Sequence, residues 1–471
     1  MRQMVDDSFN DETVSVNLKL IAAGTLLPAT LAGVGPDVSM DGDPVGFGIR
    51  NAVIPLNYFG KETVDRMNEG VAEDDKVLNF EEVKEACFQG NEEMFVPLTV
   101  LDPDRIEYAD GTKADQHDEI KEYRVVDGIV RNGVVTYGLP STLDFPMLFY
   151  RKDIFVDLGL EVPETWDDVE GVIRALSENQ MEMGVSQALT QIYMYQSGLE
   201  WFKSAVDYEE GVEISADDRE YMRTVGIASN LDSNGALDAF QRMTEWFTLY
   251  GQPVAFDFAN RFRTGEMPIA IAAYTTYNQL RVFAPEIAGL WEFVQLPGVE
   301  REDGTINHAS PAAPHAMMMM KDAADDISEN QDVTESKKAQ NSWKYLQWWV
   351  SYDTQARFGQ EQVAIMGTAA KYNTANINAL TAQSWTAQEK RNLLQQFRSL
   401  KGTPMSPGNY IVARYTNFAF YAVVDDGEVA SEAMLGYVDD INHELSRKRD
   451  EYGFLTMEEY MEELAAKGKE A

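Results

Sequence analysis

Residues 137–168 read YGLPSTLDFPMLFYRKDIFVDLGLEVPETWDD, and this stretch decides the fold. Two short apolar runs, VVTYGLP and PMLFYRK, are typical of buried strands. Thr165 then stands three residues before Asp168, the spacing of a helix N-cap and its reciprocal partner. The apolar residues that follow recur at helical spacing: Trp166, Val169, Val172, Ile173 and Leu176. The order strand, strand, helix predicts an α/β protein.

The same alternation continues on the carboxyl side. ALDAFQRMTEWFTLYG (236–251) has a helical apolar period and is stopped by Gly251 and Pro253. PIAIAAY (268–274), WEFVQLP (291–297) and HAMMMM (315–320) are predicted strands. The four methionines suggest either a metal site or one continuous buried strand of a parallel sheet, and the pattern favours the strand. We therefore expect α/β lobes with largely parallel sheets.

After residue 322 the chain is predicted to be mostly helical. SWKYLQWWVSYDTQARFG (342–359) and EVASEAMLGYVDDINHELSRKRDEYG (428–453) both carry apolar stripes. The tryptophans of the first and the Met434, Val438, Ile441 and Leu445 stripe of the second are interpreted as core.

The amino-terminal segment predicts a helix that runs into a strand. Residues 1–12 place Met1, Met4, Val5 and Phe9 on one stripe, and the apolar residues of 14–20 then alternate. A helix followed by a strand is the second half of a βαβ unit, so we expect a preceding strand upstream of Met1. The first residues also lack the apolar core of a signal peptide, which places any leader and membrane anchor upstream as well.

Length and charge narrow the class of protein. A chain of 471 residues exceeds the ~250–300 residues at which single cores stop growing, so two lobes are expected. The formal charge of −39 repels nucleic acid and anionic lipid. Cys87 is the only cysteine, which excludes an internal disulfide and a C-x-x-C site.

No pattern in the sequence indicates catalysis. The sequence has four histidines, but it contains no nucleophile elbow, no zinc-protease motif and no phosphate-binding loop. His308 and His315 are seven residues apart without a companion cysteine or carboxylate, which is weak support for a metal. The 78 acidic residues make some pair of carboxylates inevitable, so a glycosidase-like pair carries no information. We predict no catalytic residue, no metal and no cofactor.

The 137–168 stretch resembles the lobe-crossing segment of family 1 extracellular solute-binding proteins of ABC importers, the group that includes maltose-binding protein. TLAGVGPDV (30–38) and FRTGEMPIAIAAYTTYNQL (262–280) look like two further segments of that family, in the same order. The resemblance extends over nearly the whole chain.

This resemblance implies a type II periplasmic-binding-protein fold with two hinged α/β lobes, a ligand cleft and a helical carboxyl-terminal region. We expect lobe one to comprise residues 1–142 and 258–322, and lobe two 143–257 and 323–471. The implied function is capture of a polar solute, with a sugar or oligosaccharide favoured, by a monomer that delivers it to ABC permease subunits. The implied location is extracellular or periplasmic. A glycan-active hydrolase or lyase, and a ligand-sensing subunit of a membrane receptor, remain alternatives.

The candidate ligand-binding residues combine aromatic rings with carboxylate, hydroxyl, amide and guanidinium groups, a mixture that suits a sugar. They are chosen because they are expected where strands end. In lobe one they are Asp43, Ser141, Thr142, Tyr274, Tyr277 and Asn278, and in lobe two Asp144, Tyr193, Tyr195, Tyr372 and Arg414.

Overall fold

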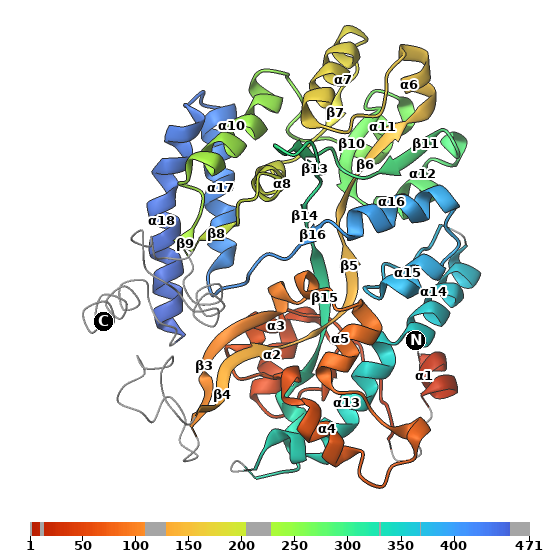
Figure 1. The fold of residues 1–471 in the computed structure, drawn as a ribbon, viewed down its shortest axis with the longest axis vertical. Coiled ribbons are helices and arrows are strands. Elements are labelled where there is room, and N and C mark those ends of the chain that lie inside the picture. Colours follow the sequence, from red (N-terminus) through yellow and green to blue (C-terminus); the bar gives the residue numbers. More distant parts are fainter. Residues whose placement is uncertain are drawn as a thin grey trace. The chain divides into compact units, whose positions relative to one another are not determined.

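The computed structural model describes residues 2–9, 14–108, 129–203, 228–328, 331–367 and 369–452. The chain divides into two compact units, and each contains its own sheet and helices (Figure 1). Unit 1 comprises Met1–Leu143 and Ala313–Ser384, and unit 2 comprises Asp144–Ala312 and Trp385–Ala471. Within the described ranges, no helix is both long and apolar enough to cross a membrane.

Unit 1 is built around the strand that the methionine run predicts. β15 (Ala313–Met320) lies between β1 (Val38–Ser39) and β2 (Val53–Ile54), and β5 (Leu139–Asp144) also pairs with it. Met317 to Met320 are all fully buried, so the run is a core strand, as predicted. The other elements of this unit are α1 (Arg2–Ser8), α2 (Ala23–Leu31), α3 (Pro44–Gly48), η1 (Leu56–Tyr58), α4 (Lys61–Met67), η2 (Glu73–Asp75), α5 (Phe80–Phe88), η3 (Glu92–Met94), η4 (Val96–Leu98), β3 (Thr99–Tyr108), β4 (Ile129–Thr136), η8 (Lys321–Ala324), η9 (Val333–Glu335), α13 (Lys337–Val350), α14 (Tyr352–Met366) and α15 (Ile377–Ala382).

Unit 2 has a second sheet, in the order β11 (Trp291–Val294), β6 (Pro146–Arg151), β10 (Ile269–Ala273), β7 (Met183–Gly184). Its other elements are α6 (Lys152–Leu158), α7 (Trp166–Glu178), α8 (Leu189–Gln196), β8 (Phe202–Lys203), β9 (Ala228–Ser229), α10 (Asn234–Thr248), α11 (Phe258–Thr264), α12 (Thr276–Phe283), η7 (Pro285–Ile287), β12 (Val299–Glu300), β13 (Ile306–Asn307), β14 (Ser310–Pro311), α16 (Ala387–Phe397), β16 (Leu400–Lys401), α17 (Asn409–Val424) and α18 (Ala430–Glu451).

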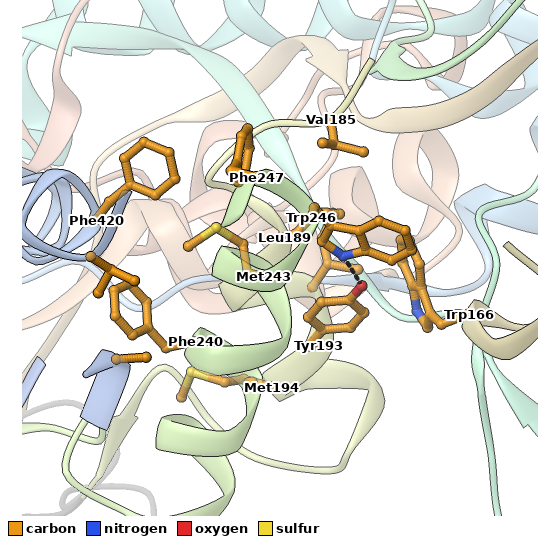
Figure 2. Packing of buried hydrophobic residues seen from close by; sticks show 14 of the residues in the cluster. Trp166, Val185, Leu189, Tyr193, Met194, Phe240, Met243, Trp246, Phe247 and Phe420 are labelled. Atoms are coloured by element: carbon orange, nitrogen blue, oxygen red, sulfur yellow. Dashed lines mark hydrogen bonds between the residues drawn. The ribbon is translucent and has the colours of Figure 1, made fainter. Parts of the chain in front are cut away.

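The core of unit 2 lies between helices. Figure 1 shows α10, α17 and α18 packed side by side, and contacts among the three helices agree with this view. Figure 2 shows Phe240, Met243 and Phe247 of α10 in the core, with Phe420 of α17 beside Phe247. The predicted stripe on α18, from Met434 to Leu445, is buried in the same cluster. These contacts confirm the core interpretation of the 428–453 segment.

Two expectations about the strands are wrong. β1 and β2 pair with β15 in antiparallel fashion, and β10 and β11 pair with β6 in the same way, whereas β10 and β7 are parallel. Residues 14–22 form no strand, and the Leu20 side chain is fully exposed. An alternating pattern makes a strand only where a neighbouring strand accepts its hydrogen bonds. The helix before it is confirmed over α1, where Met4 and Val5 are buried.

The division of the chain also differs from the one expected. Residues 258–312 belong to unit 2, because β10 pairs with β6 along its whole length. Residues 323–384 belong to unit 1, because α13 packs against β15. Strand pairing and helix packing between segments far apart in sequence therefore set these boundaries.

Thr165 caps α7 as predicted. Its hydroxyl accepts the Asp168 backbone N–H, and the Asp168 carboxylate accepts the Thr165 backbone N–H at 2.9 Å. Thr165→Ala is expected to lower the free energy of unfolding of unit 2 by about 1 kcal/mol, since it leaves a helix-terminal N–H without its acceptor. Denaturant melts followed by circular dichroism measure this loss. Thr165→Ser keeps the hydroxyl and is expected to unfold like the parent; an equal loss in both variants would contradict the capping role.

Candidate ligand-binding residues

The end of β10 brings three polar or aromatic side chains of unit 2 together. The Tyr274 backbone N–H donates to the Phe145 carbonyl at 2.9 Å, and the two rings lie 4.6 Å apart. The Thr275 hydroxyl donates to Asp144 Oδ2 at 2.5 Å, while Asp144 Oδ1 accepts the Phe145 N–H. Asp144 and Tyr274, both predicted from the sequence, are therefore neighbours through the β6–β10 pairing. Thr275 completes this cluster and is not among the predicted residues.

Tyr277 and Asn278 follow on α12. The Tyr277 ring contacts Trp291, Phe293 and Trp385 at centroid distances of 5.6, 5.9 and 5.0 Å. Burial, more than the nearby Glu389 carboxylate, raises the pKa of Tyr277 to about 12. The Tyr277 hydroxyl is thus a neutral hydrogen-bonding group at physiological pH.

Trp385 is a half-buried aromatic residue that is not among the predicted ligand-binding residues. Its sequence signal is the following helix start: Thr386 caps α16 with Glu389 in a reciprocal capping box. Trp385 therefore stands just before the N-cap, a position that is often apolar and packed.

In unit 1, Ser141 and Thr142 of β5 pair with the segment that follows Tyr372. The Ala375 N–H donates to the Ser141 carbonyl, and Thr142 forms a bridge with Thr374. The Ser141 hydroxyl accepts the Trp349 indole N–H at 3.1 Å.

Tyr372 is buried in unit 1 beside Phe358, and its burial raises the pKa of its hydroxyl. The structure thus places Tyr372 in unit 1, whereas Tyr274, Tyr277 and Asn278 lie in unit 2. All four assignments reverse the expected lobes.

Asp43 is exposed and caps α3. Its carboxylate Oδ1 accepts the Gly46 N–H at 2.9 Å. One carboxylate oxygen therefore has a structural role, and Pro44 and Val45 immediately after it are buried.

Tyr193 and Tyr195 lie on helix α8 and not at the end of a strand. Tyr193 is 2% exposed, and its hydroxyl accepts the Trp246 indole N–H at 2.6 Å (Figure 2). Burial raises the pKa of Tyr193, and these contacts give it a packing role. The Tyr195 hydroxyl lies 2.9 Å from the Thr403 hydroxyl and accepts from the Gln191 amide at 3.0 Å.

Arg414 is exposed on α17, with its guanidinium 6.0 Å from the centre of the Tyr410 ring. It likewise lies on a helix and not at a strand end.

The two histidines considered for a metal have other neighbours. His308 Nδ1 lies 2.6 Å from the Leu296 carbonyl in unit 2, and His315 Nδ1 lies 3.3 Å from Asp41 in unit 1. Among the residues that the structure describes, no group of three or more His, Cys, Asp or Glu side chains is placed to hold a metal ion.

Residues 93–356, more than half of the chain, match the sequence profile of the family described as bacterial extracellular solute-binding protein. The chain belongs to this family. The family predicted from the 137–168 stretch is thereby confirmed, and the matched region of this solute-binding protein contains that stretch and the end of β10. A sequence search of curated proteins finds no match.

Solved structures share the fold of this solute-binding protein at low sequence identity. The sugar-binding protein MalE of Xanthomonas citri has a TM-score of 0.63 and 17% identity, over 96% of this chain and 95% of that one. An ABC transporter solute-binding protein of Thermotoga lettingae, bound with α-D-tagatose, has a TM-score of 0.58 and 16% identity, over 94% and 95%. MalE of Listeria monocytogenes in complex with maltose has a TM-score of 0.57 and 14% identity, over 95% and 96%. These similarities confirm the predicted type II periplasmic-binding-protein fold.

Proposed function

We propose that this solute-binding protein is the substrate-binding component of an ABC importer and that it captures a sugar or oligosaccharide outside the cytoplasm. The family match carries the first part of the proposal. The sugar-bound or sugar-binding proteins among the solved structures with this fold support the second. The solute is released unchanged to permease subunits, and the protein is anchored to the membrane.

The residue chemistry around the start of α12 supports a carbohydrate ligand. Trp385 offers a half-buried aromatic ring, Tyr274 and Tyr277 are buried and support the cluster from within, and Asp144, Thr275 and Asn278 offer acceptors and donors for sugar hydroxyl groups. Asp144, Thr275 and Asn278 are each only partly buried, so ligand atoms have access to them. We propose this cluster of unit 2 as the principal contact surface, with Ser141, Thr142 and Asp43 of unit 1 as further candidates.

Ligand binding is tested by thermal unfolding against a panel of probes that includes maltose, maltotetraose and tagatose. A sugar that binds the folded chain stabilises it by RT ln(1 + [L]/Kd), about 2.7 kcal/mol at a hundredfold excess over Kd. We expect at least one sugar of the panel to raise the melting temperature saturably. Amino acids and phosphate esters at equal concentration serve as controls, and a shift with these alone would contradict a sugar ligand.

A glycan hydrolase or lyase is the competing function, and mass spectrometry separates it from binding. After prolonged incubation with the stabilising sugar, we expect the sugar to be recovered unchanged. Any protein-dependent product would overturn the proposal. A sensing role differs in its partner, so pull-down of permease subunits, as against a receptor, distinguishes the two.

Asp144→Asn is expected to weaken sugar binding by about 10- to 100-fold. A hydrogen bond to a charged acceptor contributes about 1.5–3 kcal/mol, and the amide removes the charge with little change in shape. Calorimetric titration with the stabilising sugar measures the change. Asp439→Asn, on the exposed face of α18, is the matched control and is expected to bind like the parent. Equal affinity in both variants would remove Asp144 from the site.

A further inference from the structure

The sequence contains five Asp–Gly pairs, and the structure describes three of them: Asp41–Gly42, Asp303–Gly304 and Asp426–Gly427. The other two, at 110–111 and 127–128, lie outside the described residues. Glycine has no side chain beside its backbone nitrogen, so the carboxyl group of a preceding aspartate can approach that nitrogen closely. The direction in which each glycine N–H points therefore distinguishes the three described pairs.

In the first pair, the nitrogen of Gly42 faces the carboxyl group of Asp41. The Gly42 backbone N–H donates to Asp41 Oδ1 at 2.9 Å. The N–H groups of Gly304 and Gly427 instead donate to backbone carbonyls three and four residues earlier in the chain, at 2.9 and 3.2 Å. Among the three described pairs, only Asp41–Gly42 has the glycine nitrogen directed at the carboxyl group of its own aspartate.

The direction of this N–H is the direction in which a covalent bond would form. In a cyclic imide of Asp41 and Gly42, the planar nitrogen carries the carboxyl carbon of Asp41 in the place of the former amide hydrogen. The five-membered ring consists of this nitrogen and the C, Cα, Cβ and Cγ atoms of Asp41. The observed hydrogen bond thus holds the two reacting groups beside each other in the arrangement of the product, which lowers the entropic part of the barrier.

Two neighbouring side chains favour the same reaction. The Ser39 hydroxyl donates at 2.6 Å to the Asp41 carbonyl, which belongs to the same peptide group as the Gly42 N–H. This bond polarises the peptide group and assists loss of the N–H proton. His315 Nδ1 lies 3.3 Å from Asp41 Oδ1, where a protonated imidazole can donate to the departing oxygen. The Asp41 side chain is 73% exposed, so water has access to the site.

We propose that Asp41–Gly42 is a site of spontaneous isomerisation in the folded protein. The Gly42 nitrogen loses its proton and bonds to Asp41 Cγ, while the C–OH bond of the neutral carboxyl group breaks, so one water molecule leaves. Water then opens the imide: attack at Cγ restores aspartate, and attack at the main-chain carbonyl carbon gives isoaspartate. The reaction requires no oxidant, reductant or cofactor, and it does not depend on the proposed ligand.

Isoaspartate at residue 41 lengthens the main chain by one methylene group directly before α3. Asp43 caps this helix, and Pro44 and Val45 after it are buried. The modification therefore changes the path by which the chain enters α3. The net charge is unchanged, because the released main-chain carboxylate replaces the side-chain carboxylate.

Peptide mapping of the folded chain tests the proposal. The protein is incubated at mildly acidic pH, where more of the carboxyl groups are neutral, and isoaspartate and imide are located by electron-transfer mass spectrometry. We expect both products to accumulate at residue 41 at about ten times the rate at residues 303 and 426, since only the first pair has its reacting groups directed at each other. A rate at residue 41 no higher than at the other two would overturn the proposal.

The same incubation in guanidinium chloride separates the fold from the local sequence. Unfolding releases the nitrogen atoms of all three glycines, so the three rates are expected to converge. If residue 41 kept its full advantage in denaturant, the folded geometry would not be its cause and the proposal would fail. Asp41→Glu is the matched variant, because it keeps the charge but requires a six-membered ring. It is expected to give no product at residue 41 and unchanged rates at residues 303 and 426; product at residue 41 in this variant would contradict the imide route.

Discussion

Replacing Phe240 with alanine is expected to destabilise unit 2 by about 3–5 kcal/mol. Phe240 is fully buried on α10 and belongs to the hydrophobic cluster of unit 2, where Figure 2 shows it near Met194. Alanine forfeits the transfer free energy of the ring and leaves a cavity among helices that pack on both sides of α10, so the site cannot collapse fully. Denaturant unfolding followed by fluorescence and circular dichroism gives the loss.

Phe283→Ala provides the same substitution on the surface. Phe283 ends α12, is 47% exposed and has its ring under the Arg263 guanidinium at 5.3 Å. Its removal is expected to cost about 1 kcal/mol or less, the value of an exposed cation–π contact. If Phe240→Ala cost no more than Phe283→Ala, the packing described for unit 2 would be wrong.

Features that depend on local sequence could be predicted. The start of α7 is fixed by Thr165 and Asp168, three residues apart, and their reciprocal hydrogen bonds form as expected. The buried Met317–Met320 strand and the buried stripe of α18 follow in the same way from one segment's own pattern. Such features can be predicted without knowing which distant residues they contact. The hydrogen bonds at a helix end and the apolar character of a continuous run depend on a few neighbouring residues.

Features that depend on distant partners could not be predicted. The direction of β6 relative to β10 is set by pairing between Tyr150 and Ile269, residues far apart in the chain, and no local pattern distinguishes an antiparallel partner from a parallel one. The same pairing moves residues 258–312 into unit 2. The alternating segment 14–20 lacked a partner strand, and so it formed none.

The candidate site residues could be predicted only where the ends of the strands could be predicted correctly. Asp144 and Tyr274 meet because β5 and β10 do end near them, while Tyr193 and Tyr195 were assigned to a strand end that is in fact helix α8. Leu189, Ile192 and Tyr193 are spaced by three and four residues, which is a helical face, and this signal identifies Tyr193 as core. Thr275 has no distinguishing pattern of its own, and the capping box after Trp385 indicates a packed residue there without indicating its partner. Their positions beside Asp144 and Tyr277 come from tertiary packing.

Gly48→Ala is expected to destabilise unit 1 by up to about 3 kcal/mol, or more if the neighbouring ring cannot move. A Cβ on Gly48 would lie 2.3–2.5 Å from three ring carbons of Tyr137, a residue with no exposed surface. The ring is rigid and buried, so α3 or the Tyr137 segment between β4 and β5 must shift to admit one methyl group. Thermal unfolding monitored by circular dichroism tests this, with Gly24→Ala as the matched control.

Gly24 lies in α2 with nothing within 4 Å of its added Cβ, so alanine there is expected to stabilise unit 1 by about 0.5–1 kcal/mol. The two variants thus make the same chemical change in the same unit with opposite expected signs, and a parent-like melting temperature for Gly48→Ala would mean that Tyr137 is not held against α3.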